Sequence, residues 1–208
     1  MNSDLLINAF VTLFVTIDPP GLAAISLGLT VGMNSAQRRQ VALRGVLIGV
    51  GVLIAFMMIG AALLSTLGIT MEAFRVAGGL LLFYIAFEMV FEKRQERHEK
   101  SAERAITRDD IHNVAVFPLA IPLIAGPGSI SASILLASQF STPIERITLV
   151  GILLSVAVIL YLSLALADKV DHLIGDTGRI VATRLLGILL AALSVQYIAD
   201  GVRNLAAS

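Results

Sequence analysis

The sequence predicts an all-α membrane protein in which six transmembrane helices form two inverted three-helix repeats, with helices 1 and 4 broken at Pro/Gly motifs. The first observation behind this prediction is composition, because 57% of the 208 residues are hydrophobic and only 14% are charged. Soluble domains are roughly 45–50% apolar and about 25% charged. The second is that six apolar segments are long enough to cross a bilayer, which takes about 20 residues. The third is a Pro/Gly motif at an equivalent place in each half.

The apolar segments follow one another with little sequence between them. The predicted spans are residues 5–30, 42–67, 71–91, 113–139, 146–167 and 181–203. The N-terminal MNSDLLINAF has an acid and no basic region, so we expect it to open the first span and not to be a cleaved signal peptide. The one extended polar stretch has mixed charge and no apolar period, which is typical of a solvated linker. We therefore predict a single membrane domain, 1–208, made of a first repeat (1–91), a charged cytoplasmic linker (92–112) and an inverted second repeat (113–208).

The positions of lysine and arginine predict the orientation, because cytoplasmic loops of membrane proteins carry an excess of both. Twelve of the fifteen fall on the side of the charged linker. The other three, Arg75, Arg146 and Arg203, fall on the opposite side. We therefore expect a multi-pass protein of the cell inner (plasma) membrane, with the linker in the cytoplasm and both termini outside it.

Several functions are excluded by composition. The formal net charge is zero, so nucleic acid has no electrostatic reason to bind. The absence of cysteine rules out Cys-ligated zinc, iron–sulfur clusters and thiol nucleophiles. No G-x-x-x-x-G-K-[ST] motif occurs, so no ATP site is expected. We predict no metal and no cofactor. The expected partners are a small-molecule substrate and the lipid bilayer, and the composition leaves open whether the protein forms a homo-oligomer.

The two halves of the chain repeat one another at a few positions. A shift of 107 residues places Pro20 on Pro127, and a shift of 109 residues places Arg75 on Arg184. Each half has an odd number of predicted spans, so the second half enters the membrane in the opposite direction. This is the inverted-repeat organisation found in secondary transporters.

The Pro/Gly motifs interrupt the first and fourth segments. Each proline removes a backbone donor and clashes with the preceding turn. Both breaks lie about 13 residues into their segments, roughly 20 Å at 1.5 Å per residue, so both are expected near the bilayer midplane. Irregular backbone at that depth is tolerated only where it is buried in protein or lines a wet cavity. The candidate substrate site therefore comprises the residues of the two breaks: Thr16, Asp18, Pro19, Pro20, Gly21, Gly126, Pro127, Gly128 and Ser129.

A new helix is expected to begin at each break. Asp18 is a good N-cap with Pro19 at the first helical position, and Gly126–Pro127 is a similar start. Two helix N-termini, each with partial positive charge, would then face each other and favour an anion or a dipolar ligand between them. The structural alternatives are two packing kinks and, for Asp18, a role limited to capping. Because a charge at the midplane costs several kcal/mol, we interpret Asp18 as functional.

Other polar residues have simpler interpretations. Glu88 lies one turn from the cytoplasmic end of its segment and is expected to snorkel to the interface. Arg75 and Arg184, near the ends of their segments, are expected to be anchors. Ser129 is followed by two further serines, at 131 and 133, and such serines either contact a ligand or hold membrane helices together.

At these motifs the sequence resembles the MarC family of bacterial and archaeal inner-membrane proteins, which includes SnatA-type neutral amino acid transporters. The resemblance covers the whole chain and rests on Ile17–Gly21, on Arg184–Gly187 and above all on the stretch Phe117–Ser129. It implies six helices in two inverted halves, with discontinuous first and fourth helices that form the substrate site. It also implies transport of small neutral amino acids such as glycine, alanine, serine or threonine.

The chemistry of the breaks is compatible with such a zwitterion. Its carboxylate would bind the helix N-terminus around Gly126–Ser129, where no acid competes. Its ammonium group would bind Asp18 and the carbonyls near Thr16 and Ile17. Asp18 is also the proton-coupling candidate, because burial disfavours the charged form of a carboxyl group. The sequence leaves these two roles of Asp18 open.

The leading interpretation is a secondary transporter that works by alternating access, and not an enzyme. A serine hydrolase using Ser129 would need a base, but the three histidines, His98, His112 and His172, fall in or next to the cytoplasmic loops. The other alternative is a non-transporting membrane protein, such as an assembly factor or partner subunit, in which paired broken helices would have no use. The substrate, the direction of transport and the coupling ion stay open.

Overall fold

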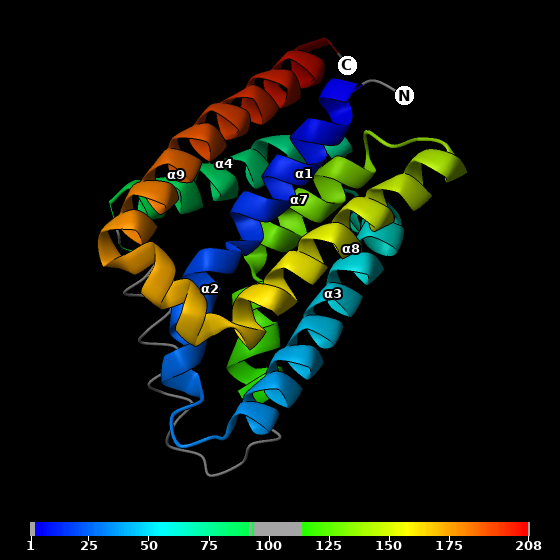
Figure 1. Cartoon of the computed structure of the whole chain (residues 1–208). Coiled ribbons are helices and arrows are strands. Elements are labelled where there is room, and N and C mark those ends of the chain that lie inside the picture. Colours follow the sequence, from blue (N-terminus) through cyan, green and yellow to red (C-terminus); the bar gives the residue numbers. More distant parts are fainter. Residues whose placement is uncertain (1–2, 92, 94–113, 208) are drawn as a thin grey trace.

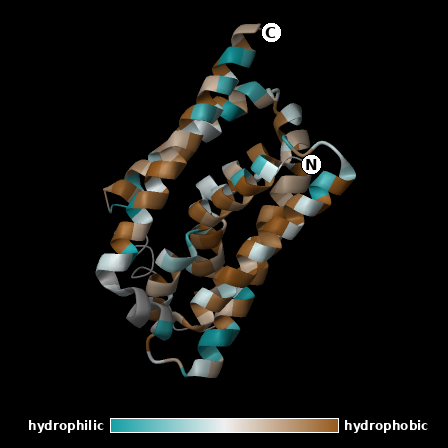
Figure 2. Ribbon diagram, turned by 45° about the horizontal axis from the view of Figure 1, so that its top comes forward, coloured by the Kyte–Doolittle hydropathy of each residue, from teal (hydrophilic) through white to brown (hydrophobic). Residues whose placement is uncertain are grey.

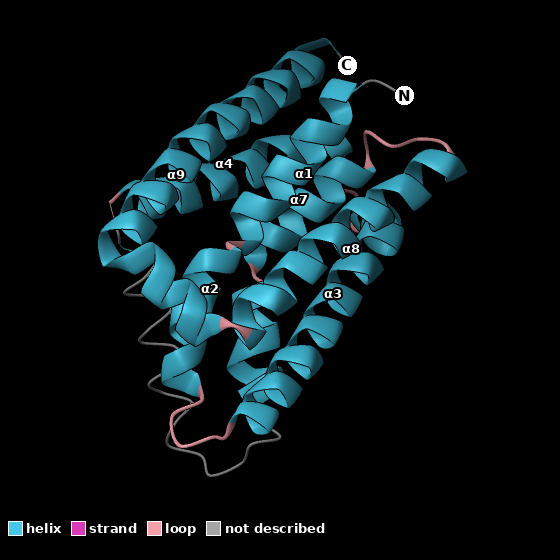
Figure 3. Cartoon of the chain, viewed as in Figure 1, coloured by secondary structure: helices cyan, strands magenta, loops and turns pink. Residues whose placement is uncertain are grey.

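The computed structural model of the chain describes residues 3–91, 93 and 114–207, and these residues fold into helices joined by short loops (Figures 1 and 3). The helices are α1 (Ser3–Ile17), α2 (Pro19–Leu29), α3 (Ser35–Thr66), α4 (Met71–Val90), η1 (Ala115–Ile124), α7 (Pro127–Ala137), α8 (Pro143–Ala165) and α9 (Ala167–Ala207). No strand occurs in the described residues, so the all-α prediction is confirmed. Apart from Lys93, the predicted linker 92–112 lies outside the described residues.

Five stretches of the described chain are long and apolar enough to cross a membrane: Ser3–Leu29, Ser35–Thr66, Met71–Val90, Pro143–Ala165 and Thr177–Ala207. The pair Ala115–Ile124 and Pro127–Ala137, which is bent by 56°, would be a sixth span if it is counted as one. The chain is therefore built as a multi-pass membrane protein.

Large apolar side chains cover the outside of the helix bundle. Leu47 of α3 is 63% exposed, Val158 of α8 is 58% exposed and Leu185 of α9 is 59% exposed. In water this would be an unusually extensive apolar surface. Figure 2 shows hydrophobic residues along the middle of the helices and hydrophilic ones gathered towards their ends, as expected for helices whose middles contact lipid.

Two helices begin before the apolar segments that predicted them. Asn34 accepts a hydrogen bond from the Gln37 N–H (3.0 Å), and the Gln37 side chain accepts one from the Asn34 N–H (2.9 Å). The same capping box forms at α8, where the Glu145 N–H donates to Thr142 Oγ1 (3.3 Å) and Glu145 Oε2 accepts from the Thr142 N–H (3.0 Å). Because these boxes stabilise a polar first turn, a count of apolar residues misses it.

The segment before the second break is less regular than predicted. Within η1, Phe117 (φ −132°, ψ 123°) and Ile121 (φ −130°, ψ 123°) leave the helical conformation. Each precedes a proline, whose ring pushes the residue before it towards extended backbone. The Phe117–Pro118 and Ile121–Pro122 peptide bonds are cis. The irregular backbone of this segment therefore begins at Phe117, whereas the sequence predicts a break only at Gly126–Pro127.

Glycines allow close contact between α4 and α9, the most extensively packed pair of helices. A Cβ atom on Gly79 would lie 3.0 Å from the Ser194 carbonyl oxygen, and one on Gly187 would lie 3.1 Å from the Ala86 carbonyl oxygen. Small residues at such contacts let membrane helices approach backbone to backbone. The stretch Arg184–Gly187 thus ends in a glycine that serves this contact.

Helix α3 holds η1 and α7 in the same way. A Cβ atom on Gly45 would lie 2.5 Å from Leu119 Cδ2, and one on Gly49 would lie 2.6 Å from Ile124 Cγ2. The spacing of four residues between Gly45 and Gly49 is a recognised signal for close helix packing. The irregular η1–α7 segment is thereby packed directly on α3, which is a continuous helix.

Both termini lie at one end of the bundle, as Figure 1 shows. The loop between α2 and α3 and the junction between α8 and α9 lie towards the opposite end (Figure 1). The basic residues at the start of α3, Arg38 and Arg39, are therefore far from the termini. Which end faces the cytoplasm stays a prediction from the charge bias.

Candidate functional site

The first break is a single residue, Asp18, between α1 and α2. Its backbone is left-handed (φ 59°, ψ 64°), a conformation that aspartate tolerates better than most residues. Its N–H still donates to the Phe14 carbonyl (2.9 Å), and its own carbonyl accepts from the Leu22 N–H (3.0 Å). Asp18 therefore ends one helix and starts the next without leaving either of these backbone groups unpaired.

The side chain of Asp18 caps α2, as the sequence predicts. Pro19 and Pro20 have no N–H, so the first donor of α2 is Gly21, which donates to Asp18 Oδ1 at 3.2 Å. A Cβ atom on Gly21 would overlap Asp18 Oδ2, so glycine leaves the space that the carboxylate fills. Asp18 is only 4% exposed, and Oδ2 makes no hydrogen bond within the described part of the chain. One acceptor of the carboxylate is thus left unused.

The second break separates η1 from α7. Gly126 has extended backbone (φ −88°, ψ 172°) and stands at the N-cap of α7, with Pro127 in the first turn, as predicted. A Cβ atom on Gly126 would lie 2.5 Å from the Pro122 carbonyl oxygen, so the chain turns tightly here. No side chain caps α7. The N-terminus of α7 is therefore an uncapped set of donors inside the protein.

Ser129 links the two breaks. Its hydroxyl donates to the Thr16 carbonyl at 3.4 Å, across a sequence separation of 113 residues. The Thr16 hydroxyl donates to the Thr12 carbonyl at 2.8 Å. Thr16 is 1% exposed and Ser129 is 3% exposed. The fold thus brings Thr16, Asp18 and Ser129 of the predicted site together in a region closed to solvent.

Gly128 has a different neighbour from the other residues of the breaks. A Cβ atom there would overlap Ile85 Cδ1 of α4, so this glycine provides space for α4. The next residues of α7 are buried too: Ser131 is 4% exposed and Ser133 is 0% exposed. The Ser133 hydroxyl has no hydrogen-bond partner in the described structure, which makes it an unusual buried donor.

The prediction that Glu88 snorkels to the interface is wrong. The side chain is 4% exposed and lies within the bundle on α4. A residue one turn from the end of a helix reaches the interface only if its face of the helix is open. The side of α4 that carries Glu88 is closed to solvent, although it lies opposite the side that contacts α9 through Gly79 and Ala86.

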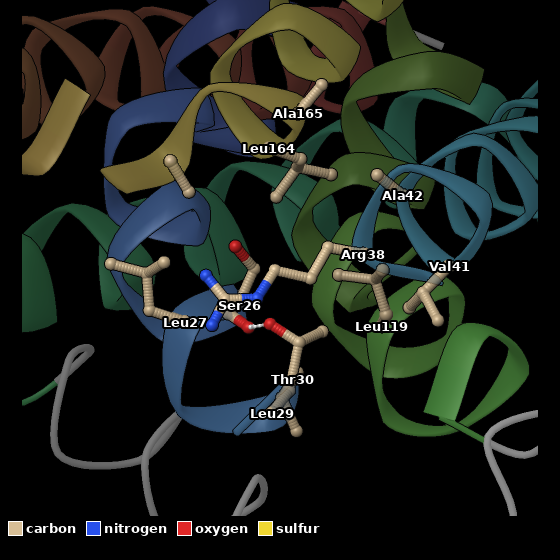
Figure 4. Close-up of a pocket in the computed structure, with 11 residues that line it drawn as sticks. Ser26, Leu27, Leu29, Thr30, Arg38, Val41, Ala42, Leu119, Leu164 and Ala165 are labelled. Carbon is tan, nitrogen blue, oxygen red and sulfur yellow. Dashed lines mark hydrogen bonds between the residues drawn. The ribbon is translucent and has the colours of Figure 1, made fainter. Parts of the chain in front are cut away.

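A small polar cavity, which sequence reasoning did not find, lies at the end of α2 (Figure 4). Its polar lining consists of Ser26, Thr30 and Arg38, and Figure 4 shows the Arg38 side chain pointing towards Ser26. Thr30 Oγ1 donates to the Ser26 carbonyl at 2.6 Å. The volume of about 20 Å³ available to water has room for about one molecule. The cavity lies beyond the first break, on the side away from the termini.

Metal binding has no support in the described residues. No group of three or more His, Cys, Asp or Glu side chains comes together there. His98 and His112 lie outside the described residues, and the side chain of His172 is not described.

The fold and these breaks define a helical, multi-pass integral membrane protein with irregular backbone in its interior. The sequence profile of the MarC family integral membrane proteins matches residues 3–206, and the chain belongs to this family. It is 37% identical over 199 residues to a UPF0056 membrane protein of Methanocaldococcus jannaschii, which covers 96% of this chain and 87% of the relative. It is 34% identical over 202 residues to the UPF0056 inner membrane protein MarC of Citrobacter koseri, which covers 92% and 91% of the two chains. No solved structure matches it.

Proposed function

We propose that this protein is a secondary transporter that carries a small neutral amino acid across the membrane by alternating access, with the substrate bound between the two breaks. The observation that carries the proposal is the hydrogen bond from Ser129 Oγ to the Thr16 carbonyl (3.4 Å), because it joins the two Pro/Gly motifs in the interior. Discontinuous helices that meet in this way form the substrate sites of inverted-repeat transporters.

Equivalent packing in the two halves supports an inverted repeat. Helix α2 packs against α8 and α9, and helix α7 packs against α3 and α4. In each case the helix that follows a break packs against the second and third spans of the other half. This pattern is expected if α2 corresponds to α7, α3 to α8 and α4 to α9. The capping boxes that begin α3 and α8 occupy equivalent places in the same correspondence. The proposal therefore treats each broken helix as one span and assigns three spans to each half.

The polarity of the breaks supports a zwitterionic substrate. The uncapped N-terminus of α7 offers backbone donors and the positive end of a helix dipole, which suit a carboxylate. Asp18 Oδ2 and the Thr16 carbonyl offer acceptors, which suit an ammonium group. Because Ile85 fills the space beside Gly128, a substrate there would need a small side chain.

The breaks are closed to solvent, so transport requires a conformational change. Asp18, Thr16 and Ser129 are each at most 4% exposed. An alternating-access transporter exposes its site to one side at a time by moving one repeat against the other. The conformation described here therefore corresponds to an occluded state in this proposal.

The proposal has no catalytic step. The Ser129 hydroxyl donates to a backbone carbonyl, and a carbonyl cannot act as the base that a serine nucleophile needs. We also propose that the protein resides in the inner membrane, because a relative from Citrobacter koseri is named an inner membrane protein. The predicted charge bias then places both termini outside the cytoplasm.

The test is uptake of radiolabelled glycine, alanine, serine and threonine into liposomes that contain the purified protein, with and without a proton gradient. We expect saturable uptake of at least one of them. The variant Asp18→Asn keeps the cap but loses the charge, so it should abolish uptake, or its dependence on the gradient, and leave the thermal stability in detergent unchanged.

The matched control is Asp4→Asn, which removes an acid from the first turn of α1, far from the breaks. Its uptake should equal that of the unmodified protein. Absence of uptake of all four amino acids by folded protein would contradict the proposal and favour a non-transporting role.

A further inference from the structure

A second polar pocket lies at the end of the bundle that carries both termini. Its volume available to water is about 300 Å³, far more than that of the cavity near Ser26. Side chains from four parts of the chain line it: Asn8, Arg75, Gln139, Gln196, Tyr197 and Asp200. We call it the termini-side pocket. The termini-side pocket lies outside the proposed substrate site between the breaks.

Two opposite charges line the termini-side pocket and do not pair with each other. Among the residues that the structure describes, Asp200 accepts a hydrogen bond from Gln196 Nε2 at 2.9 Å and forms no salt bridge. The Arg75 side chain makes no hydrogen bond or ion pair within the described part of the chain. Both residues are half-buried. An anchor at the membrane surface needs neither a pocket nor a partner of opposite charge, so the prediction that Arg75 is only an anchor leaves this arrangement unexplained.

The remaining lining of the pocket consists of Leu193 and of neutral side chains that form hydrogen bonds. Gln139 Nε2 donates to the Tyr197 hydroxyl at 3.3 Å, which ties the end of α7 to α9. Asn8 Oδ1 accepts from Thr12 Oγ1 at 3.1 Å. A pocket with one cation, one anion and several fixed neutral polar groups matches a small solute that carries both charges.

A line of polar groups connects the pocket to the breaks along one face of α1. Thr12 donates to Asn8, Thr16 donates to the Thr12 carbonyl, and Ser129 donates to the Thr16 carbonyl. Residues four apart on a helix lie above one another, so Asn8, Thr12 and Thr16 form a stripe. At 1.5 Å per residue, the stripe from Asn8 to Thr16 is roughly 12 Å long. Both threonines of the stripe are buried, Thr12 at 0% and Thr16 at 1% exposed.

We propose that the termini-side pocket is a second binding site for a small zwitterion, in which Arg75 binds the carboxylate and Asp200 binds the ammonium group. The stripe on α1 joins this site to the one between the breaks. The choice of an amino acid as the zwitterion rests on the proposed function, whereas the position and the polarity of the site do not.

Tyrosine fluorescence reports on this pocket directly. The chain contains three tyrosines and no tryptophan, and Tyr197 lines the pocket. The purified full-length protein is made with Asp18→Asn, which disables the site between the breaks, and is titrated with L-alanine. We expect a saturable change in emission that is lost in the further variant Tyr197→Phe. Propionate, which lacks the ammonium group, and ethylammonium, which lacks the carboxylate, should bind at least 10-fold more weakly.

Single-charge variants complete the test. Arg75→Gln and Asp200→Asn should each weaken L-alanine binding about 10-fold, which corresponds to the loss of one charge-assisted hydrogen bond. Arg203→Gln is the matched control, because Arg203 lies on the same part of α9, is exposed and does not line the pocket. Its binding should be unchanged.

The outcomes separate this inference from the proposed function. If the unmodified protein transports alanine but neither charge variant alters binding, the termini-side pocket is not a binding site and the transport proposal stands. If L-alanine binds and depends on Arg75 and Asp200 while no uptake occurs, the pocket is confirmed and the transport proposal fails. Equal binding of L-alanine, propionate and ethylammonium would overturn the assignment of a zwitterion.

Discussion

The two Pro/Gly breaks start similar helices but satisfy the first turn differently. At α2 the carboxylate of Asp18 accepts from Gly21, so the helix carries its own negative group. At α7 the N-cap is Gly126, which has no side chain, and the donors stay uncapped. In the proposed inverted repeat, the two equivalent breaks thus have opposite polarity. Under that proposal the difference makes the site asymmetric and suits it to a ligand with a positive and a negative end.

The largest effect is expected from replacing Asp18, with one variant that keeps the cap of α2 and one that removes it. Asp18→Asn keeps a side chain that caps and that tolerates left-handed backbone. Asp18→Ala loses the cap and strains the backbone, so the free energy of unfolding should fall by about 2–3 kcal/mol. Both variants should lose uptake or its dependence on the proton gradient. Thermal unfolding in detergent measures the stability, and liposome uptake measures the activity.

If Asp18→Asn transports normally and only Asp18→Ala fails, Asp18 is a cap and nothing more. The two breaks would then differ in stability alone and not in function.

A smaller effect is expected from crowding the carboxylate. Gly21→Ala would place a Cβ atom against Asp18 Oδ2, so the carboxylate must move. We expect uptake to fall about 10-fold, with a loss of roughly 1–2 kcal/mol in stability. Kinetics of uptake and thermal unfolding measure the two effects.

The matched control is Gly28→Ala in the same helix. A Cβ atom at Gly28 meets nothing within 4 Å. Because alanine favours a helix over glycine by about 1 kcal/mol, this variant should be as stable as the unmodified protein or more so. Equal loss of uptake in both variants would show that the effect at Gly21 is not specific to the carboxylate.

The smallest effects should come from two serines of α7, and they should have opposite signs. Ser129→Ala removes the hydrogen bond to the Thr16 carbonyl, so substrate affinity should fall several-fold and stability by about 1 kcal/mol. Ser133→Ala removes a buried hydroxyl that has no partner among the described residues, so stability should rise by about 1 kcal/mol. Unfolding in detergent and the apparent KM for uptake measure both. A loss of stability in Ser133→Ala would mean that its hydroxyl binds a group essential to the fold.

The sequence predicted the spans because hydrophobicity depends on residue type alone. It also predicted where α2 and α7 begin, because a proline without an N–H next to Asp18 or Gly126 leaves few alternatives. It did not predict the irregular backbone of η1, because the apolar composition of this segment is that of a continuous span even though Pro118 and Pro122 interrupt it. The termini-side pocket was not predicted either, since Arg75 and Asp200 are 125 residues apart and nothing local connects them.

By itself, then, the sequence determined the membrane class, the approximate spans and the places where two helices must break. These depend on transfer free energies and on the chemistry of single residues. Only the tertiary structure decided that Ser129 reaches Thr16, that Glu88 is covered and that Gly128 makes room for Ile85. Such contacts depend on which faces of distant helices meet, and in a membrane that is decided by close packing between side chains, which hydrophobicity alone does not encode.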